Sequence, residues 1–320
     1  MPSNAKVVKS GHELDARLVP TRDEVLTRLA SLRQHQQGGQ RSPHKPLLVL
    51  LALGHLHVYG TSELYWSNVE TRLADLITEF GRSSKTSRTQ SAAYPFTRLR
   101  SDNVWILDHD VPMDLVSPLT ANQVVGRFEP SLESALVKDP DLIRSVARAL
   151  VEENFPATVA PDVLSAVGFD PDAVLYGTHA MRDRLGLGRR RRDPNWREAI
   201  LRAWDRQCAF CGYDGQIGGA TVGIDAAHVR WFAFDGPDSL NNGLALCVLH
   251  HKLFDRGVLG LDESLQIDIS TGYTARTSAG RAIYELRGLP LKPRRGSPLP
   301  ALEHVKWHRC EVFKGRALSA

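Results

Sequence analysis

The stretch that decides the fold of the C-terminal half is residues 241–257, which read NNGLALCVLHHKLFDRG. Its first part is short and apolar, which is typical of a buried strand ending at Cys247. A helix is expected to begin at about Val248. Upstream, residues 222–229 (VGIDAAHV) are apolar around one acid and predict a second strand. The pattern therefore predicts two short strands followed by a helix.

Cysteine and histidine spacing within this region is typical of a metal site. Cys208-x2-Cys211 precedes the two strands, and Cys247-x2-His250 joins the second strand to the helix. Thiolates and a neutral imidazole are preferred ligands of tetrahedral Zn²⁺, and four protein ligands make a closed, structural site. A thioredoxin-like redox pair is the alternative, but the residues after Cys211 open a turn and not the helix that such a pair needs. Cys310 has no role in this site and is expected to be a buried small apolar residue.

Length and composition exclude several classes of protein. The 320 residues predict about two domains, and 42% hydrophobic with 24% charged residues is ordinary globular composition. The longest apolar run, residues 47–53, is much too short to cross a bilayer, and the N-terminus has no apolar signal segment. Four cysteines, all after residue 207, favour a reducing compartment. We therefore expect a cytoplasmic protein with no membrane partner.

The N-terminal half has mostly helical periodicity. Pro140 divides the helical pattern of residues 131–154, and Tyr94-Pro95-Phe96 is expected to interrupt any helix. Helical spacing covers residues 25–32, 47–56 and 69–80, and a short strand is predicted over 104–107. We therefore predict an α+β protein with a mostly helical first domain at 1–170, an Arg-rich linker at 171–193 and a zinc-stabilised second domain at 194–320.

The net charge of +4 is unevenly distributed along the chain. Basic residues concentrate in segments 82–100, 182–206 and 287–316. A single basic cluster is explained equally well by an ordinary solvated surface as by a binding site. Three such segments, one of them beside the metal knuckle, favour a polyanionic partner.

The order His228, Asn242, His251 and the FDRG that follows resemble the HNH nucleases, in particular those of McrA-like, modification-dependent (type IV) restriction endonucleases. The resemblance spans about residues 194–270. It implies a ββα-metal fold around one catalytic divalent ion, Mg²⁺ or Mn²⁺.

The resemblance also implies a role for each residue. His228 would accept a proton from the attacking water, and Asn242 would hydrogen-bond across the loop and orient that base. His251 would hold the divalent ion, with Asp225 as a second ligand. Many HNH proteins have an acid directly before the first histidine, where this chain has Ala227. Since positions 225 and 228 face opposite sides of a strand, Asp225 is expected to need a bulge or loop to reach the metal.

Two shorter motifs in the N-terminal half resemble the DNA sulfur-binding domain of restriction enzymes that recognise phosphorothioate DNA. They are Ser-Pro-His44-Lys45-Pro and Tyr94-Pro95-Phe-Thr-Arg98, and the resemblance covers about residues 15–165. By this similarity, Tyr94 and Pro95 would line an apolar pocket for sulfur, with Arg98 at its edge. The remaining DNA contacts would come from His44, Lys45 and Arg82. The alternative is that Tyr94-Pro95-Phe96 only turns the chain.

These features together predict a modification-dependent DNA endonuclease acting on phosphorothioate duplexes. Two alternatives stay open: a non-catalytic zinc-containing DNA-binding protein, and an HNH nickase or homing-type nuclease that ignores modification. Pure binding does not require His228, Asn242 and His251 together. Since one HNH site cuts one strand, double-strand cleavage would also imply two protomers, and a homodimer is a mechanistic expectation.

Overall fold

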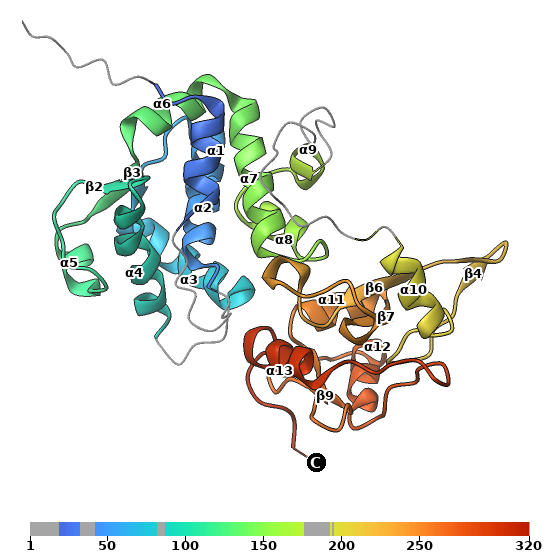
Figure 1. Cartoon of the computed structure of the whole chain (residues 1–320). Coiled ribbons are helices and arrows are strands. Elements are labelled where there is room, and N and C mark those ends of the chain that lie inside the picture. Colours follow the sequence, from blue (N-terminus) through green and yellow to red (C-terminus); the bar gives the residue numbers. More distant parts are fainter. Residues whose placement is uncertain (1–18, 33–41, 82–86, 176–192, 194, 320) are drawn as a thin grey trace, which may run out of the picture.

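A computed structural model describes residues 19–32, 42–81, 87–175, 193 and 195–319. The described part forms two bodies that follow one another in the sequence (Figure 1). We call residues 19–175 the N-terminal body and residues 193–319 the C-terminal body. Each has its own cluster of buried hydrophobic side chains. Arg182, the four arginines 189–192 and Arg82 lie outside the described residues.

The N-terminal body is built mainly from helices, as predicted. They are α1 (Arg22–Ala30), α2 (His44–Tyr59), α3 (Trp66–Phe80), α4 (Arg88–Arg98), the 3-10 turn η1 (Leu99–Asp102), α5 (Val116–Ala121), α6 (Pro130–Lys138), α7 (Pro140–Asn154), α8 (Ala160–Ala166) and α9 (Pro171–Leu175). Helix α2 lies in the centre and is buried from Pro46 to Gly54 on all sides. This burial explains why its sequence is apolar nearly all round.

Caps and prolines set where the helices of this body begin. Thr21 and Glu24 form a reciprocal capping box at the start of α1. Glu129 caps α6 and Asp139 caps α7, each followed by a proline at the first helical position. The break predicted at Pro140 is therefore confirmed as the junction of α6 and α7.

Pro95 does not interrupt a helix, so that prediction was wrong. Helix α4 continues through it to Arg98. Proline removes one backbone donor, but Ala92, Ala93 and Phe96 of the same helix are fully buried. Phe96 also packs on Trp66 and Trp105, with ring centroids 5.1 and 5.9 Å apart. This packing outweighs the local cost of proline near the helix end.

A small antiparallel sheet covers one side of the helices. Its strands are β1 (Leu64–Tyr65), β2 (Trp105–Leu107) and β3 (Val125–Phe128), in the order β1-β3-β2. Strand β2 confirms the strand predicted at 104–107. Val174 of α9 is in the same core as these elements. The packed N-terminal body therefore reaches beyond residue 170.

The C-terminal body combines short hairpins with four helices. Its elements are α10 (Trp196–Ala203), β4 (Gln216–Ile217), β5 (Ala220–Thr221), β6 (Ile224–His228), η3 (Phe232–Phe234), η4 (Leu240–Asn242), β7 (Gly243–Cys247), α11 (Val248–Asp255), β8 (Leu259–Leu261), β9 (Ile267–Ile269), α12 (Ser278–Arg281), η5 (Ala282–Leu286) and α13 (Leu302–Glu311). Strands β6 and β7 pair antiparallel, with His228 opposite Gly243, and α11 follows directly. This confirms the strand, strand and helix predicted from the sequence.

Gly243 brings α10 against this strand pair. A Cβ at this position would lie 2.2 Å from Ile200 Cδ1 and 2.9 Å from the Trp196 ring. Only glycine permits this approach without a shift of the helix. As a result, Trp196 lies directly beside the end of β6, where His228 is located.

Cys310 is exposed on α13, so the expectation that it is buried was wrong. Its neighbours at His304, Val305, His308 and Glu311 are the residues that α13 buries. Cys310 therefore faces away from the side on which the helix packs. Within the described part of the chain, no helix is both long and apolar enough to span a bilayer.

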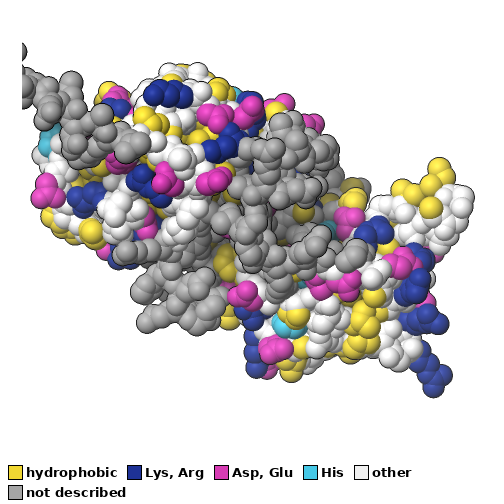
Figure 2. Space-filling model, turned by 45° about the horizontal axis from the view of Figure 1, so that its top comes forward, with side chains coloured by type: hydrophobic (Ala, Val, Ile, Leu, Met, Phe, Trp, Pro, Cys, Tyr) yellow, Lys and Arg dark blue, Asp and Glu magenta, His cyan; other side chains and the backbone are white. Residues whose placement is uncertain are grey.

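Basic and acidic side chains are mixed on the face shown in Figure 2. The described arginines of segment 82–100 pair with acids from other segments. Arg88 pairs with Asp75, Arg98 with Asp114 and Arg100 with Asp110. A segment that is purely basic in sequence is therefore partly neutralised in the fold.

Candidate active site and metal centre

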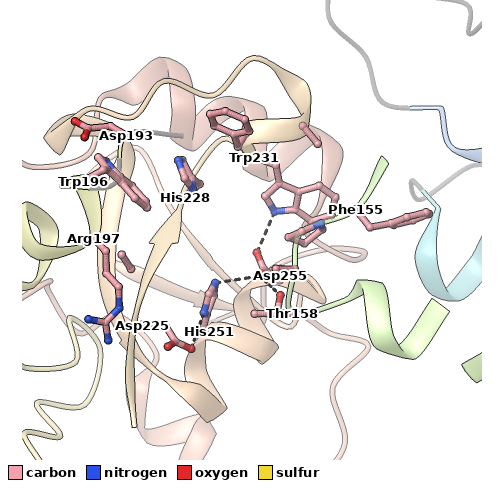
Figure 3. Close-up of a pocket in the computed structure, with 15 residues that line it drawn as sticks. Phe155, Thr158, Asp193, Trp196, Arg197, Asp225, His228, Trp231, His251 and Asp255 are labelled. Carbon is pink, nitrogen blue, oxygen red and sulfur yellow. Dashed lines mark hydrogen bonds and ion pairs between the residues drawn. The ribbon is translucent and has the colours of Figure 1, made fainter. Parts of the chain in front are cut away.

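A cavity of about 510 Å³ lies over β6 and α11. Figure 3 shows that its side chains come from both bodies. The C-terminal body supplies most of the wall, and the α7–α8 loop of the N-terminal body supplies the rest. The lining residues are Phe155, Pro156, Ala157, Thr158, Asp193, Trp196, Arg197, Asp225, Ala226, His228, Trp231, Phe232, Ala233, His251 and Asp255.

His228 lies at the end of β6 and is held on two sides. Its Nε2 is 2.8 Å from Asp238 Oδ1, and only 11% of its side chain is exposed. The Trp196 ring stacks on the imidazole, with centroids 3.8 Å apart and 19° between planes. A carboxylate at Nε2 favours the proton on that nitrogen and makes Nδ1 the basic one. The arrangement suits a residue that takes a proton from water.

Asn242 is fully buried and ties together the loop that follows β6. Its Oδ1 accepts from the Arg230 backbone N–H at 2.8 Å, and its Nδ2 donates to the carbonyls of Arg230 and Pro237, both at 3.0 Å. This loop carries Asp238, the partner of His228. Asn242 therefore fixes the backbone that positions Asp238.

His251 of α11 is flanked by two carboxylates. Its Nδ1 is 3.3 Å from Asp225 Oδ2, and its Nε2 is 3.2 Å from Asp255 Oδ2. Burial lowers the pKa of His251, but the two carboxylates outweigh burial and raise it to about 9. The hydrogen bond from His251 in turn lowers the pKa of Asp225.

Asp225 and His251 fit a divalent metal ion. An oxygen and a nitrogen that share one ion at roughly 2.1 Å each lie about 3 Å apart, close to the 3.3 Å seen here. Strand β6 pairs regularly with β7 from Ile224 to His228, without a bulge. Asp225 meets His251 without a bulge, since His251 comes across from α11 to the side of the strand that Asp225 occupies. The role of Asp225 as a metal ligand stays a prediction.

Cys208, Cys211, Cys247 and His250 form a second cluster, whose ligand atoms all lie within 4.8 Å of one another. His250 Nδ1 is 3.4 Å from Cys208 Sγ and 3.3 Å from Cys247 Sγ. Ligand atoms of a tetrahedral Zn²⁺ lie roughly 3.6 Å apart, so the donor set and its spacing fit that ion.

The charges in this cluster also favour a bound cation. Hydrogen bonds from the Cys211 and Cys247 thiols lower the pKa of Cys208. Burial lowers the pKa of His250, but the neighbouring cysteines outweigh it and raise that pKa to about 9. A bound cation would hold the thiolates and release these protons. His250 and His251, adjacent in sequence, thus face two different sites.

Of the residues expected to contact DNA, those that the structure describes lie on the neighbouring helices α2 and α4. Lys45 at the start of α2 pairs with Asp102 of η1 at 2.5 Å, which brings His44 and Lys45 to the end of α4. Tyr94 is half-buried, and Pro95 is buried within α4. Arg98 forms a two-point ion pair with Asp114 at 2.6 and 2.5 Å and lies 5.2 Å from the Tyr94 ring centre. Arg82 lies outside the described residues.

Sequence reasoning missed several side chains of the site, which come from segments with no motif of their own. Trp196, Trp231 and Thr158 line the cavity, and Asp238 pairs with His228. Asp255 had a recognisable signal, because it follows His251 by one helical turn and therefore shares its face of α11.

Two family models match the chain. The model "ScoMcrA-like, DNA sulfur-binding domain" matches residues 22–172. The model "HNH endonuclease" matches residues 208–262, which include every metal-site and catalytic candidate of the C-terminal body. No curated protein matches this sequence.

Solved structures with a similar fold include three from McrA-type proteins. The sulfur binding domains of ScoMcrA and SprMcrA, each complexed with phosphorothioated DNA, are both 19% identical with a TM-score of 0.39. They cover 45% and 47% of this chain, and 97% and 94% of theirs. The type IV phosphorothioation-dependent restriction endonuclease ScoMcrA is 22% identical with a TM-score of 0.39, and the match covers 62% of this chain and 34% of that one.

One family match falls in each of the two bodies of the fold. The N-terminal match includes the described members of the tyrosine, proline and basic motifs, and the C-terminal match includes His228, Asn242 and His251. The chain therefore joins a ScoMcrA-like DNA sulfur-binding domain to an HNH endonuclease domain.

Proposed function

We propose that this protein cuts DNA that carries phosphorothioate linkages, with the N-terminal body as reader domain and the C-terminal body as nuclease domain. One observation carries the proposal: a histidine held by a carboxylate (His228) and an aspartate and histidine spaced for a divalent ion (Asp225 and His251) share one cavity, in a chain that also has a DNA sulfur-binding domain. Binding alone would not require the first two features.

His228 is the general base of the proposed reaction. Its Nδ1 takes a proton from a water molecule, and the water oxygen attacks the phosphorus. The bond from phosphorus to the 3′ oxygen breaks, leaving a 5′ phosphate and a 3′ hydroxyl after that oxygen takes up a proton. Asp225 and His251 would hold a divalent ion, Mg²⁺ or Mn²⁺, which when bound would supply positive charge to the transition state and the leaving oxygen.

Cys208, Cys211, Cys247 and His250 hold the proposed structural Zn²⁺. This site ties the segment after α10 to the start of α11. It therefore fixes the helix from which His251 projects. A closed site of this kind has no open position for a substrate, so its role is to stabilise the fold.

The reader region is proposed to be the surface around Tyr94, with His44 and Lys45 beside it. Sulfur in place of a phosphate oxygen is larger and less hydrated, so a half-buried aromatic ring is a favourable neighbour. Lys45 and Arg98 are held by Asp102 and Asp114. These carboxylates fix the two cations in place and reduce their attraction for ordinary phosphate, which favours discrimination over general DNA binding.

A plasmid assay tests the proposed function. The purified full chain is incubated with Mn²⁺ or Mg²⁺ and either a phosphorothioate-containing plasmid or its unmodified counterpart. We expect cleavage of the modified plasmid only, and loss of about 10²–10⁴-fold in rate for His228→Ala. Binding to two short duplexes that differ by one sulfur is measured alongside.

Each contrary outcome points to a specific alternative. Equal cleavage of both plasmids would leave a nuclease that does not depend on modification. Selective binding without cleavage, or a His228→Ala variant as active as the natural protein, would leave a DNA-binding protein without this catalytic site.

A further inference from the structure

The N-terminal body contributes the α7–α8 loop to the cavity of the nuclease domain, and one side chain of this loop contacts a buried carboxylate there. Thr158 lies in the α7–α8 loop, and its hydroxyl donates to Asp255 Oδ2 (Figure 3). The loop is anchored in the reader core by Phe155 and Val159, each 2% exposed. Thr158 is therefore held by one domain while it contacts the other.

Salt bridges fasten this contact. Lys252 of α11 pairs with Asp162 of α8 at 2.6 Å and donates to the Thr158 carbonyl. One turn further along, Arg256 pairs with Glu79 of α3 at 2.5 Å, with its guanidinium 4.7 Å from the Phe80 ring centre. Helix α11, which carries His251, thus packs directly on the reader domain.

Asp255 is nearly inaccessible to solvent, with 2% of its side chain exposed. Trp231 Nε1 donates to its Oδ1 at 3.0 Å. Its Oδ2 accepts from Thr158 and lies 3.2 Å from His251 Nε2. Both oxygens of this buried carboxylate are therefore engaged by protein groups, and it is a poor position for a metal with water ligands.

Asp225 differs from Asp255 on this point. It lies on the Nδ1 side of His251, and 43% of its side chain is exposed in the cavity. Water ligands and a phosphate can reach this side. A histidine that binds metal through one ring nitrogen commonly donates its other N–H to a carboxylate, which fixes the ring and its tautomer.

We propose that Asp255 positions His251 as a metal ligand and that Thr158 completes this arrangement, so that both domains build the nuclease metal site. The proposal rests on the proposed single-metal nuclease function. Asp255 and Thr158 are positioning residues, since they act on the metal through His251.

Metal affinity tests the proposal without reference to cleavage. Mn²⁺ alone is titrated into the zinc-loaded full chain, and free Mn²⁺ is followed by electron paramagnetic resonance. We expect Asp255→Asn to weaken Mn²⁺ binding by about 10–100-fold. Thr158→Val removes only the hydroxyl and should weaken it by about 3- to 10-fold. Thr158→Ser keeps the hydroxyl and should restore the natural affinity.

Two controls separate this effect from general damage and from failure of the proposed function. Thr27→Val removes a hydroxyl from an exposed position of α1 in the same domain and should leave Mn²⁺ affinity unchanged. Thr158→Val should leave affinity for a phosphorothioate duplex unchanged, although Thr158 belongs to the reader domain. If no form of the protein prefers the sulfur-containing duplex, the proposed function fails while the Mn²⁺ comparison still decides this proposal.

Equal Mn²⁺ affinity of Thr158→Val and the natural protein would overturn the role of Thr158. Loss in Thr158→Ser as large as in Thr158→Val would also overturn it, because the hydroxyl would then not be the cause. Unchanged affinity in Asp255→Asn, or no Mn²⁺ binding by the natural protein, would overturn the role of Asp255.

Discussion

His228 depends on a neighbour that has no motif of its own. Asp238 comes from the loop after β6 and meets Nε2 of His228 at 2.8 Å, while Asn242 fixes the backbone of that loop. A carboxylate at one ring nitrogen both orients the imidazole and stabilises its protonated form. Catalysis at His228 should therefore be sensitive to the charge of Asp238.

Asp238→Asn tests this dependence at the scale of one residue. The variant keeps the shape of the side chain but removes its charge, so proton transfer to His228 becomes less favourable. We expect kcat to fall by at least about 10-fold. This loss should be smaller than the 10²–10⁴-fold that a general base itself contributes. DNA affinity should be unchanged. Steady-state cleavage of a modified plasmid over a range of pH measures both the fall and any shift of the pH profile.

Asp235 offers a matched control in the same loop. It is exposed, whereas Asp238 is the residue of this loop that pairs with His228. Asp235→Asn makes the same chemical change and should leave kcat as it is. A similar loss in both variants would mean that the loop, and not the Asp238 carboxylate, is responsible.

At the scale of elements, the carboxylate of Glu129 caps the N-terminus of α6, and its charge makes the strength of this cap depend on pH. Glu129 accepts from the backbone N–H groups of Ser131 and Leu132, both at 3.2 Å. Burial raises its pKa, but the hydrogen bonds from Ser131 and Leu132 outweigh burial, so the pKa lies below 4.5. A carboxyl group with a lowered pKa stabilises the fold above its unfolded pKa and loses that effect as pH falls through the folded value.

Glu129→Gln should therefore lower the free energy of unfolding by about 1 kcal/mol at pH 7. The difference from the natural protein should shrink as the pH falls below about 4.5 and through the lowered pKa of Glu129, at which the natural carboxyl becomes neutral. Urea unfolding, followed by circular dichroism at pH 7 and again well below about pH 4.5, measures this difference in the free energy of unfolding. A difference that stays constant with pH would show that the charge of Glu129 does not stabilise the cap.

Local patterns predicted most elements of the fold and the Cys3His cluster, whereas the ligands Asp225 and His251 were implied by the resemblance to HNH nucleases. The strands around Asp225 and Cys247, the helix at His251 and the break at Pro140 all follow from neighbours in sequence. Long-range contacts could not be read in this way. Pro95 stays helical because of rings packed from other segments, and Lys45 and Arg98 meet acids that no sequence window shows together with them.

At the scale of the whole molecule, the two bodies have separate cores but share one cavity. Their contact is largely polar, and it includes the pairs of Lys252 with Asp162 and Arg256 with Glu79. Contacts of this kind hold domains in place without merging their cores. The two domains should therefore unfold in separate transitions, and each should respond to changes in its own core.

Metal removal separates these transitions. In small zinc domains, structural Zn²⁺ supplies about 10–16 kcal/mol, which is comparable to the whole stability of a domain, about 5–15 kcal/mol. Chelation, or Cys211→Ser, should therefore abolish the calorimetric transition of the nuclease domain. The transition of the reader domain should remain, because none of the four ligands lies in its core.

Cys310→Ser is the matched control for this experiment, because Cys310 is an exposed cysteine of the same domain that is outside the ligand cluster. It should keep one zinc per chain, measured by atomic emission, and both transitions. Loss of both transitions in Cys211→Ser would mean that the domains unfold as one unit and that the polar contact at α11 couples them strongly. Two unchanged transitions after complete chelation would mean that the Cys3His cluster does not stabilise the nuclease domain.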